Sequence, residues 1–212
     1  DYPGKIAAIV FTQGCNFHCG YCHNPQLACP QQFQVPVEES IVLEFLKSRQ
    51  GKLQGVVVTG GEPTIQKGLL DFLAKLKSMK YAVKLDTNGS NPEILTAIIE
   101  LGLVDFIATD IKTSLPRYEE AIGVKPDVIR IKASIELIIK SGIHHQFRTT
   151  LVSSHCTKED LKDIQGYIGS SRHYVLQSFI PMSNIIDSQL LIQKQYSAQE
   201  ISDLRLQFQR GN

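Results

Sequence analysis

The feature that most constrains the fold is an alternation of short, β-rich apolar runs with longer segments of helical periodicity. The apolar runs predict strands at 5–12, 54–59, 82–86, 104–110, 144–150 and 173–178. Helical patterns follow them, at 38–50, 67–79, 92–101, 130–141, 157–168 and 197–210. Strands that alternate with helices form parallel sheets with right-handed crossovers. We therefore expect an α/β protein whose strands are parallel.

The length of the chain bears on the choice between a doubly wound sheet and a barrel. A closed eight-unit barrel needs about 250 residues, and this sequence has 212 residues and six predicted units. We predict an incomplete (β/α)6 barrel that forms a single domain over 1–212. The chain opens on Asp1 without a methionine, which we interpret as a truncated N-terminus. Both architectures place chemistry at the C-terminal ends of strands, so functional motifs should follow strands.

Composition indicates an ordinary soluble globular protein. The net charge is +1, which argues against nucleic acid as a partner, and no apolar run approaches membrane-spanning length. The densest basic stretch is interpreted as a solvated face and comprises Lys75, Lys77, Lys80 and Lys84. Three of the five cysteines fall within eight residues. This is a poor disulfide framework and a good metal-site pattern, so we expect a reducing, cytosolic location.

The cysteine cluster directly follows the first predicted strand, with the spacing Cys15-x3-Cys19-x2-Cys22. Soft thiolates select iron–sulfur clusters, zinc or copper(I). Most electron-transfer [4Fe-4S] clusters use four cysteines, so three ligands would leave one iron open, as a catalytic zinc keeps an open position. A structural zinc completed by His18 or His23 remains an alternative. The other two cysteines, at positions 29 and 156, are interpreted as structural or incidental.

Polar motifs also follow the next three strands. They are Thr59-Gly60-Gly61-Glu62-Pro63-Thr64, Asp86-Thr87-Asn88-Gly89 and Asp110-Ile111-Lys112. The paired glycines would let a ligand approach the backbone closely. Taken singly, each motif has a structural alternative: a tight turn, an Asn-Gly turn or a helix cap. Their shared position after successive strands favours one site, whereas Asn91 and Pro92 predict only the start of a helix.

The pattern Cys-x3-Cys-x-aromatic-Cys, with Tyr21 as the aromatic residue, resembles the signature of the radical S-adenosylmethionine (SAM) superfamily. In that family three cysteines hold one [4Fe-4S] cluster, whose open iron is chelated by the methionine part of SAM. The run Tyr21-Cys22-His23-Asn24 is similar to glycyl-radical-enzyme activating proteins. Residues 1–5 and 24–27 resemble those activators that serve anaerobic ribonucleotide reductase.

The resemblance implies a role for each matching residue. The cluster ligands would be Cys15, Cys19 and Cys22. Cofactor-binding positions would be Tyr21, His23, Gly60, Gly61, Glu62, Asp86, Thr87, Asp110, Lys112 and Arg148. Within this set the Gly-Gly-Glu-Pro turn would hold the ammonium of SAM, the two aspartates a monovalent cation, and the lysine the methionine carboxylate.

Two departures from the family pattern bear on the site. A histidine that some activators carry after the last strand has no match in Gln177-Ser178-Phe179-Ile180-Pro181. Some activators also carry a cysteine-rich ferredoxin-like insertion, which the 14 residues between Cys22 and Val37 are too few to hold. A single cluster is therefore expected.

The implied activity is reductive cleavage of SAM to a 5′-deoxyadenosyl radical that acts on a glycine of a partner reductase. The implied partners are a glycyl-radical enzyme, such as anaerobic ribonucleotide reductase, and an electron donor such as flavodoxin or ferredoxin. Three alternatives remain open. They are a radical enzyme acting on a small molecule, such as a deazapurine-forming synthase, a non-catalytic zinc or iron–sulfur module, and a one-cluster electron carrier.

Overall fold

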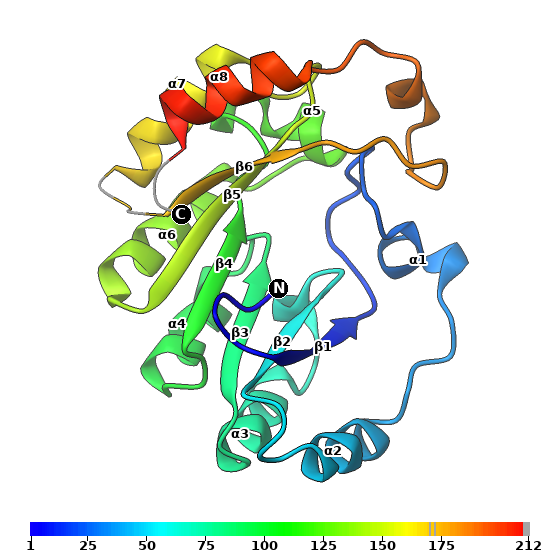
Figure 1. Cartoon of the computed structure of the whole chain (residues 1–212), viewed down its shortest axis with the longest axis vertical. Coiled ribbons are helices and arrows are strands. Elements are labelled where there is room, and N and C mark those ends of the chain that lie inside the picture. The colour runs from blue at the N-terminus through cyan, green and yellow to red at the C-terminus, as the bar shows by residue number, and fades with distance from the viewer. Residues whose placement is uncertain (170, 172, 210–212) are drawn as a thin grey trace.

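The computed structural model describes residues 1–169, 171 and 173–209, and its strands form one open parallel sheet. The strands pair in chain order, so that β1 and β6 are the two edge strands (Figure 1). Their bounds are β1 (Ala7–Thr12), β2 (Gly55–Gly60), β3 (Ala82–Thr87), β4 (Phe106–Asp110), β5 (His144–Leu151) and β6 (Tyr174–Ser178). The six predicted strands and the incomplete barrel are thereby confirmed.

The helices follow the strands as the periodicity predicts. They are α2 (Glu39–Ser48), α3 (Leu69–Ser78), α4 (Pro92–Glu100), α6 (Val128–Ser141), α7 (Lys158–Ile168) and α8 (Ala198–Phe208). The predicted end of the last helix, residue 210, lies outside the described residues. Two short helices were not predicted, α1 (Pro25–Ala28) and α5 (Tyr118–Ile122), because one turn is too short to show a hydrophobic period.

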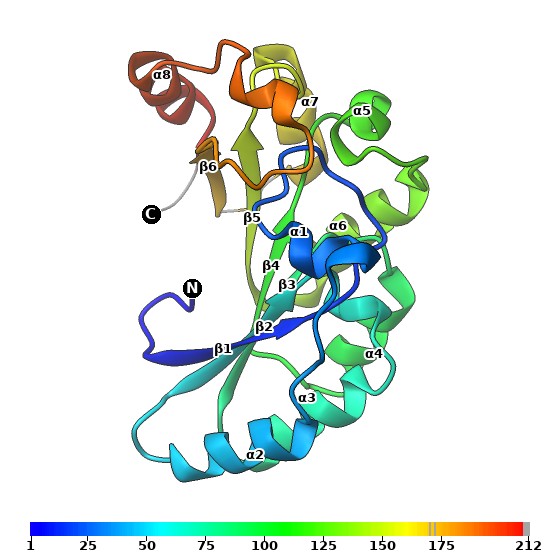
Figure 2. The ribbon, with the colours of Figure 1, turned by 90° about the vertical axis from the view of Figure 1, so that its right-hand side faces the viewer.

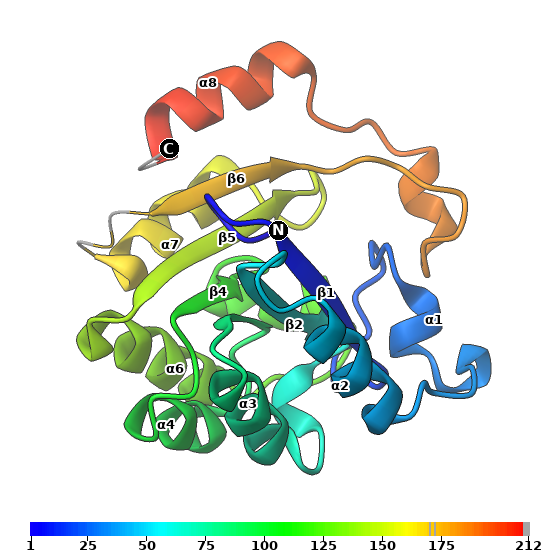
Figure 3. The same ribbon diagram turned by 60° about the horizontal axis from the view of Figure 1, so that its bottom comes forward.

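The sheet curves, and α3, α4 and α6 lie on its outer side (Figure 3). Alternate side chains of the central strands point outward and are fully buried under these helices, among them Leu85, Ile107 and Phe147. The opposite, inward-facing set on the same strands includes Asp86, Asp110 and Arg148. Because strand side chains alternate between faces, the outer set builds the core and the inner set is left for a site.

The N-terminal end of the barrel interior is closed by aromatic packing. Tyr2 is buried, and its ring lies 6.0 Å from that of Phe106 at the start of β4. The C-terminal end is crossed by the segment after β1, and in Figure 2 this segment and α1 lie in front of the strands. Among the described residues, no helix combines the length and apolarity needed to span a bilayer.

Asn91 stands at the N-cap position of α4, as predicted, but its side chain makes no bond to the helix. Its amide instead donates to the backbone carbonyl of Thr64 at 3.0 Å. The expected capping bond is therefore replaced by a tie between α4 and the Gly-Gly-Glu-Pro turn. This tie fixes the turn against the loop that follows β3.

Candidate functional site

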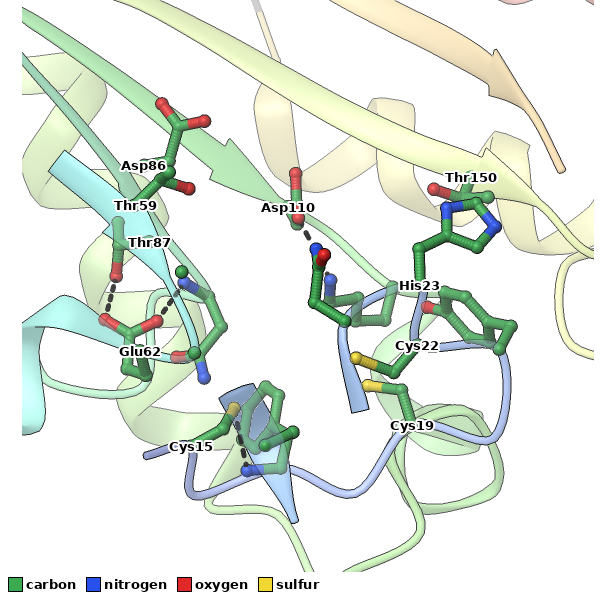
Figure 4. A pocket seen from close by; sticks show the side chains of 18 of the residues that line it. Cys15, Cys19, Cys22, His23, Thr59, Glu62, Asp86, Thr87, Asp110 and Thr150 are labelled. Atoms are coloured by element: carbon green, nitrogen blue, oxygen red, sulfur yellow. Dashed lines mark hydrogen bonds and ion pairs between the residues drawn. The ribbon is translucent and has the colours of Figure 1, made fainter. Parts of the chain in front are cut away.

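The predicted site residues meet in one cavity at the C-terminal ends of the strands (Figure 4). This placement agrees with the expectation that functional motifs follow strands. The cavity is lined by Cys15, Cys19, Tyr21, Cys22, His23, Gly60, Gly61, Glu62, Asp86, Thr87, Asp110, Lys112 and Arg148. All the residues that the sequence singled out for a cluster or a cofactor are in this set.

Backbone hydrogen bonds hold the cysteine loop from several sides. The amide of Gly14 donates to the carbonyl of Leu27 at 2.8 Å, and the amide of His18 donates to that of Ile122 at 2.8 Å. At the centre of the loop, the buried ring of Phe17 packs edge-on against Tyr118, with the centroids 6.4 Å apart. The loop is thus anchored to α1 and α5, and these contacts fix the positions of its thiols before any ligand binds.

All three thiols of the loop are free and line the cavity. Burial raises the pKa of Cys19 to about 12, although the charge of Lys112 opposes the rise, and burial also raises the pKa of Cys15 and Cys22. Among the described residues, no three His, Cys, Asp or Glu side chains gather around a point that would suit a single metal ion. The loop supplies three soft thiol donors to one cavity, and such a donor set fits an iron–sulfur group.

The sequence predicted that a ligand would approach the paired glycines closely, but the groups that do so in the structure belong to the end of β1 and the cysteine loop after it. A Cβ on Gly61 would lie 2.0 Å from the carbonyl oxygen of Gly14 and 2.9 Å from that of Leu27. Gly60 has φ +122, and a Cβ there would lie 2.3 Å from the carbonyl oxygen of Thr12. The glycines therefore let the loop pack onto the end of β2.

We expect Gly61→Ala to displace the cysteine loop. Forcing a methyl group into this contact should lower the free energy of unfolding by about 1–3 kcal/mol and reduce the iron bound after anaerobic reconstitution. Gly166→Ala is the matched control, because a Cβ there meets nothing within 4 Å and the residue lies inside α7. Thermal melts and iron analysis of both proteins check this, and normal iron content in Gly61→Ala would contradict it.

Glu62 connects the turn after β2 with the end of β3 and is fully buried. One carboxylate oxygen accepts hydrogen bonds from the amide and hydroxyl of Thr64 and from the hydroxyl of Thr87, the last at 2.7 Å. The other accepts from the amide of Asn88 at 2.6 Å. Burial raises the pKa of Glu62 even though these donors oppose the rise. An ammonium group of a ligand would favour the charged carboxylate.

Arg148 bridges the two acids at the C-terminal ends of β3 and β4. Its Nη1 lies 3.0 Å from Oδ2 of Asp86, and its Nε lies 2.7 Å from Oδ1 of Asp110. The register explains the second contact, since Arg148 pairs directly opposite Asp110 across β4 and β5. Lys112 completes the row with its Nζ 3.0 Å from Oδ2 of Asp110.

These contacts set the charges of the row. Burial alone would raise the pKa of Asp110, but Arg148 and Lys112 hold it well below its usual range. Burial would likewise lower the pKa of Lys112, but Asp110 and neighbouring groups hold it well above its usual range. Both members of this pair are therefore charged at neutral pH. The cavity wall thus presents a fixed ammonium beside the cysteine loop.

The prediction of a solvated basic face is wrong for Lys84. Its side chain is only 2% exposed and forms an ion pair with Asp86. Lys84 and Asp86 lie two residues apart on β3 and therefore share its inner face. A lysine in a strand is normally a surface residue, so only the tertiary partner reveals the buried one. We call the five residues Lys84, Asp86, Arg148, Asp110 and Lys112 the charge ladder.

No histidine stands at residues 177–181 after the last strand, and this segment contacts the cysteine loop. Here His23 of the cysteine loop stacks on Phe179, with the ring centroids 5.8 Å apart. Its Nε2 hydrogen-bonds the carbonyl oxygen of Ile180 at 2.9 Å. The segment after β6 thus orients His23. Other residues for which the sequence predicted no role also line the cavity, namely Phe17, Asn24, Ala28, Thr59, Asn88, Thr150 and Gln177.

The cavity also contains one unsatisfied polar group. The Tyr21 side chain is buried, and its hydroxyl has no hydrogen-bond partner among the described residues. Buried hydroxyls are nearly always paired, so this one is available to a polar group of a ligand. Together with Glu62 for an ammonium, Lys112 for a carboxylate and three thiols for a cluster, the residues present fit the groups that the resemblance implies.

Comparison with known proteins agrees with the family resemblance. The family model described as the radical SAM superfamily matches residues 9–167. A Methanocaldococcus jannaschii protein provisionally named a glycyl-radical enzyme activating enzyme is 34% identical over 187 residues, covering 85% of this chain and 76% of its own length. A provisionally named GTP 3′,8-cyclase of Pyrococcus horikoshii is 31% identical over 111 residues, covering 52% of this chain and 35% of the relative.

A solved structure shares the fold. SuiB of Streptococcus suis bound to S-adenosylmethionine superposes with a TM-score of 0.74 at 15% sequence identity, over 95% of this chain and 46% of SuiB. At this identity the likeness shows the fold alone. The family model, by contrast, covers most of the sequence and includes the cysteine loop and the ends of the first five strands. This chain therefore belongs to the radical SAM superfamily.

Proposed function

We propose that this radical SAM enzyme holds one [4Fe-4S] cluster on Cys15, Cys19 and Cys22 and binds SAM in the adjoining cavity. When bound, the reduced cluster supplies one electron that cleaves the sulfur–C5′ bond of SAM, so that methionine and a 5′-deoxyadenosyl radical result. The single observation that carries the proposal is the convergence of the three thiols and the strand-end motifs on one cavity. A SAM molecule there would lie within reach of both sets.

In this proposal the residues of the cavity bind and orient the cofactor. Lys112 would meet the methionine carboxylate as a point charge, and Glu62 would meet the ammonium. The adenosyl part would lie toward Tyr21 and His23, whose ring is already oriented by Ile180. The charge ladder has three positive and two negative members, so it would attract the carboxylate.

The substrate that we propose is a backbone glycine of a glycyl-radical enzyme, such as anaerobic ribonucleotide reductase. The radical would take a hydrogen atom from the glycine Cα, which gives 5′-deoxyadenosine and a glycyl radical. The naming of the M. jannaschii relative supports this choice. The open sheet supports it too, because a barrel that is not closed can admit a segment of another protein. A flavodoxin or ferredoxin would return the electron.

The test is to incubate the anaerobically reconstituted, dithionite-reduced protein with SAM and quantify 5′-deoxyadenosine and methionine. We expect both products in equal amounts. Addition of a candidate glycyl-radical enzyme should then give a glycyl radical detectable by EPR. A colourless protein with one zinc ion per chain, or a reduced cluster that leaves SAM intact, would overturn the proposal in favour of a metal module or an electron carrier.

A small-molecule substrate is the second candidate, favoured by the partial match to the GTP 3′,8-cyclase. The matched segment is about a third of that relative, so it supports a common SAM-cleaving core more than a common substrate. The same assay separates the two candidates. The small-molecule substrate would be favoured if added GTP increases the amount of 5′-deoxyadenosine and if no glycyl radical forms when a reductase is added.

A further inference from the structure

Lys84 is a member of the charge ladder that does not line the cavity. Its Nζ donates to Oδ1 of Asp86, and it lies 5.9 Å from the centre of the Phe106 ring. Phe106 in turn packs on Tyr2, so the ammonium is closed off from the N-terminal end of the barrel. A buried amine is expensive to desolvate and is retained only where it has a charged partner. Its place beneath the cofactor cavity therefore calls for a function.

The pairing within the ladder is complete. Asp86 is bound by Lys84 through one oxygen and by Arg148 through the other. Asp110 is bound by Arg148 through one oxygen and by Lys112 through the other. Every carboxylate oxygen thus has a basic side chain of this chain as a partner. Without Lys84, one oxygen of a nearly buried carboxylate would lack a cation.

We propose that Lys84 is a built-in counter-ion, whose ammonium occupies the position at Asp86 that a free monovalent cation would otherwise take, so that SAM binding by this chain needs no added cation. The statement about SAM rests on the proposed function, whereas the statement about Asp86 does not. Lys84 touches neither the thiols nor the cavity, so it is a positioning residue. It acts by fixing Asp86, which orients Arg148 and through it Asp110 and Lys112.

The monovalent cation near Asp86 and Asp110 that the family resemblance implied stays a prediction, and it is the direct competitor of this proposal. The two ideas differ in where the positive charge comes from. A side-chain ammonium is supplied by folding and is independent of the salt, whereas a free ion has to be bound from solution. The dependence on the identity of the salt therefore distinguishes them.

Lys84→Met is the informative variant, because methionine keeps most of the apolar stem and leaves only the site of Nζ open. We expect thermal melts of the anaerobically purified wild-type protein, without added SAM, to agree in sodium, potassium, ammonium and choline chloride at equal ionic strength. The variant should melt at a lower temperature in choline chloride and recover in potassium or ammonium chloride. Lys75→Met is the control, since it breaks an exposed pair with Glu39 and should show no cation selectivity.

The second measurement is SAM affinity of the reconstituted protein by equilibrium binding in the same salts. The wild type should have the same Kd in all of them. Lys84→Met should bind about tenfold more weakly in choline chloride, the effect of losing one charge partner, and regain affinity with potassium or ammonium. A wild-type Kd for SAM that falls severalfold when potassium replaces choline would overturn the proposal. This measurement uses only the wild-type protein, so it tests the proposal even if the variant does not fold.

The two measurements separate failure of this proposal from failure of the proposed function. The melts need neither SAM nor its cleavage, so they test the counter-ion directly. Variant melts that are the same in all four salts would overturn the counter-ion. If the melting temperature of Lys84→Met depends on the cation but the wild-type protein does not bind SAM, the counter-ion role of Lys84 is supported and the proposed function is refuted.

Discussion

A Cys19→Ala protein should retain no [4Fe-4S] cluster after anaerobic reconstitution and should form no 5′-deoxyadenosine from SAM. Cys19 is the most buried of the three loop thiols, and its neighbours are held by backbone bonds to other elements. The loop therefore has little freedom to bring another ligand to the vacant position. Iron and sulfide analysis, the visible spectrum and product quantification check this expectation.

Cys156→Ala is the matched control. Cys156 is also free and fully buried, but it lies outside the cavity, after β5. We expect this variant to lose about 1 kcal/mol of stability from the small space left behind and to keep its iron and activity. A Cys19→Ala protein with a full iron complement and normal SAM cleavage would remove the cluster assignment. Loss of iron in both variants would point to general misfolding instead.

The strand-end residues could be predicted because two simple periodicities combine. Apolar runs locate the strands, and parallel pairing brings all their C-terminal ends to one edge. Asp86 and Asp110 were therefore expected to lie near each other before any contact was known. Their common partner, Arg148, lies within β5 and was expected at the site only from the family resemblance, because the register that places it opposite Asp110 is visible only in the assembled sheet.

The burial of Lys84 and the close contacts of the paired glycines could not be predicted from the sequence. A lysine within a strand gives no local sign of burial. The charge that makes the burial of Lys84 possible is the carboxylate of Asp86, which is itself paired with Arg148 on β5. The glycines signal a close approach but not its partner. The Cβ contacts at Gly61 are with Gly14 and Leu27, which are more than thirty residues away in the chain.

The orientation of His23 was equally beyond a local pattern. Its orientation depends on Phe179 and on the carbonyl of Ile180, which lie at the other end of the chain. The sequence showed only that no histidine follows the last strand. The structure places a histidine of the cysteine loop against that segment. The loop after β1 and the segment after β6 thus come into contact only when the whole sheet is assembled.

Lys112→Ala should leave the cluster in place and weaken SAM binding by about 2–3 kcal/mol, which is a thirtyfold or larger rise in Kd. Lys112 bonds Asp110 and makes no hydrogen bond to a cysteine, so the iron content should not change. Its loss removes the excess positive charge of the ladder and leaves one oxygen of Asp110 facing the cavity without a partner. Titration of the reduced cluster's EPR spectrum with SAM measures the affinity.

Two explanations of that loss can be separated by a second change at Asp110. If Lys112 binds the methionine carboxylate directly, Lys112→Ala with Asp110→Asn should still bind SAM weakly, because the positive partner is absent. If Lys112 only neutralises Asp110, removing the negative charge as well should restore affinity, and the assignment of a direct contact would then be wrong. Lys77→Ala, which breaks a solvent-accessible pair with Asp105, supplies the baseline for losing a lysine. The double-mutant cycle isolates the coupling between the two residues, since they are in direct contact and their effects should not add.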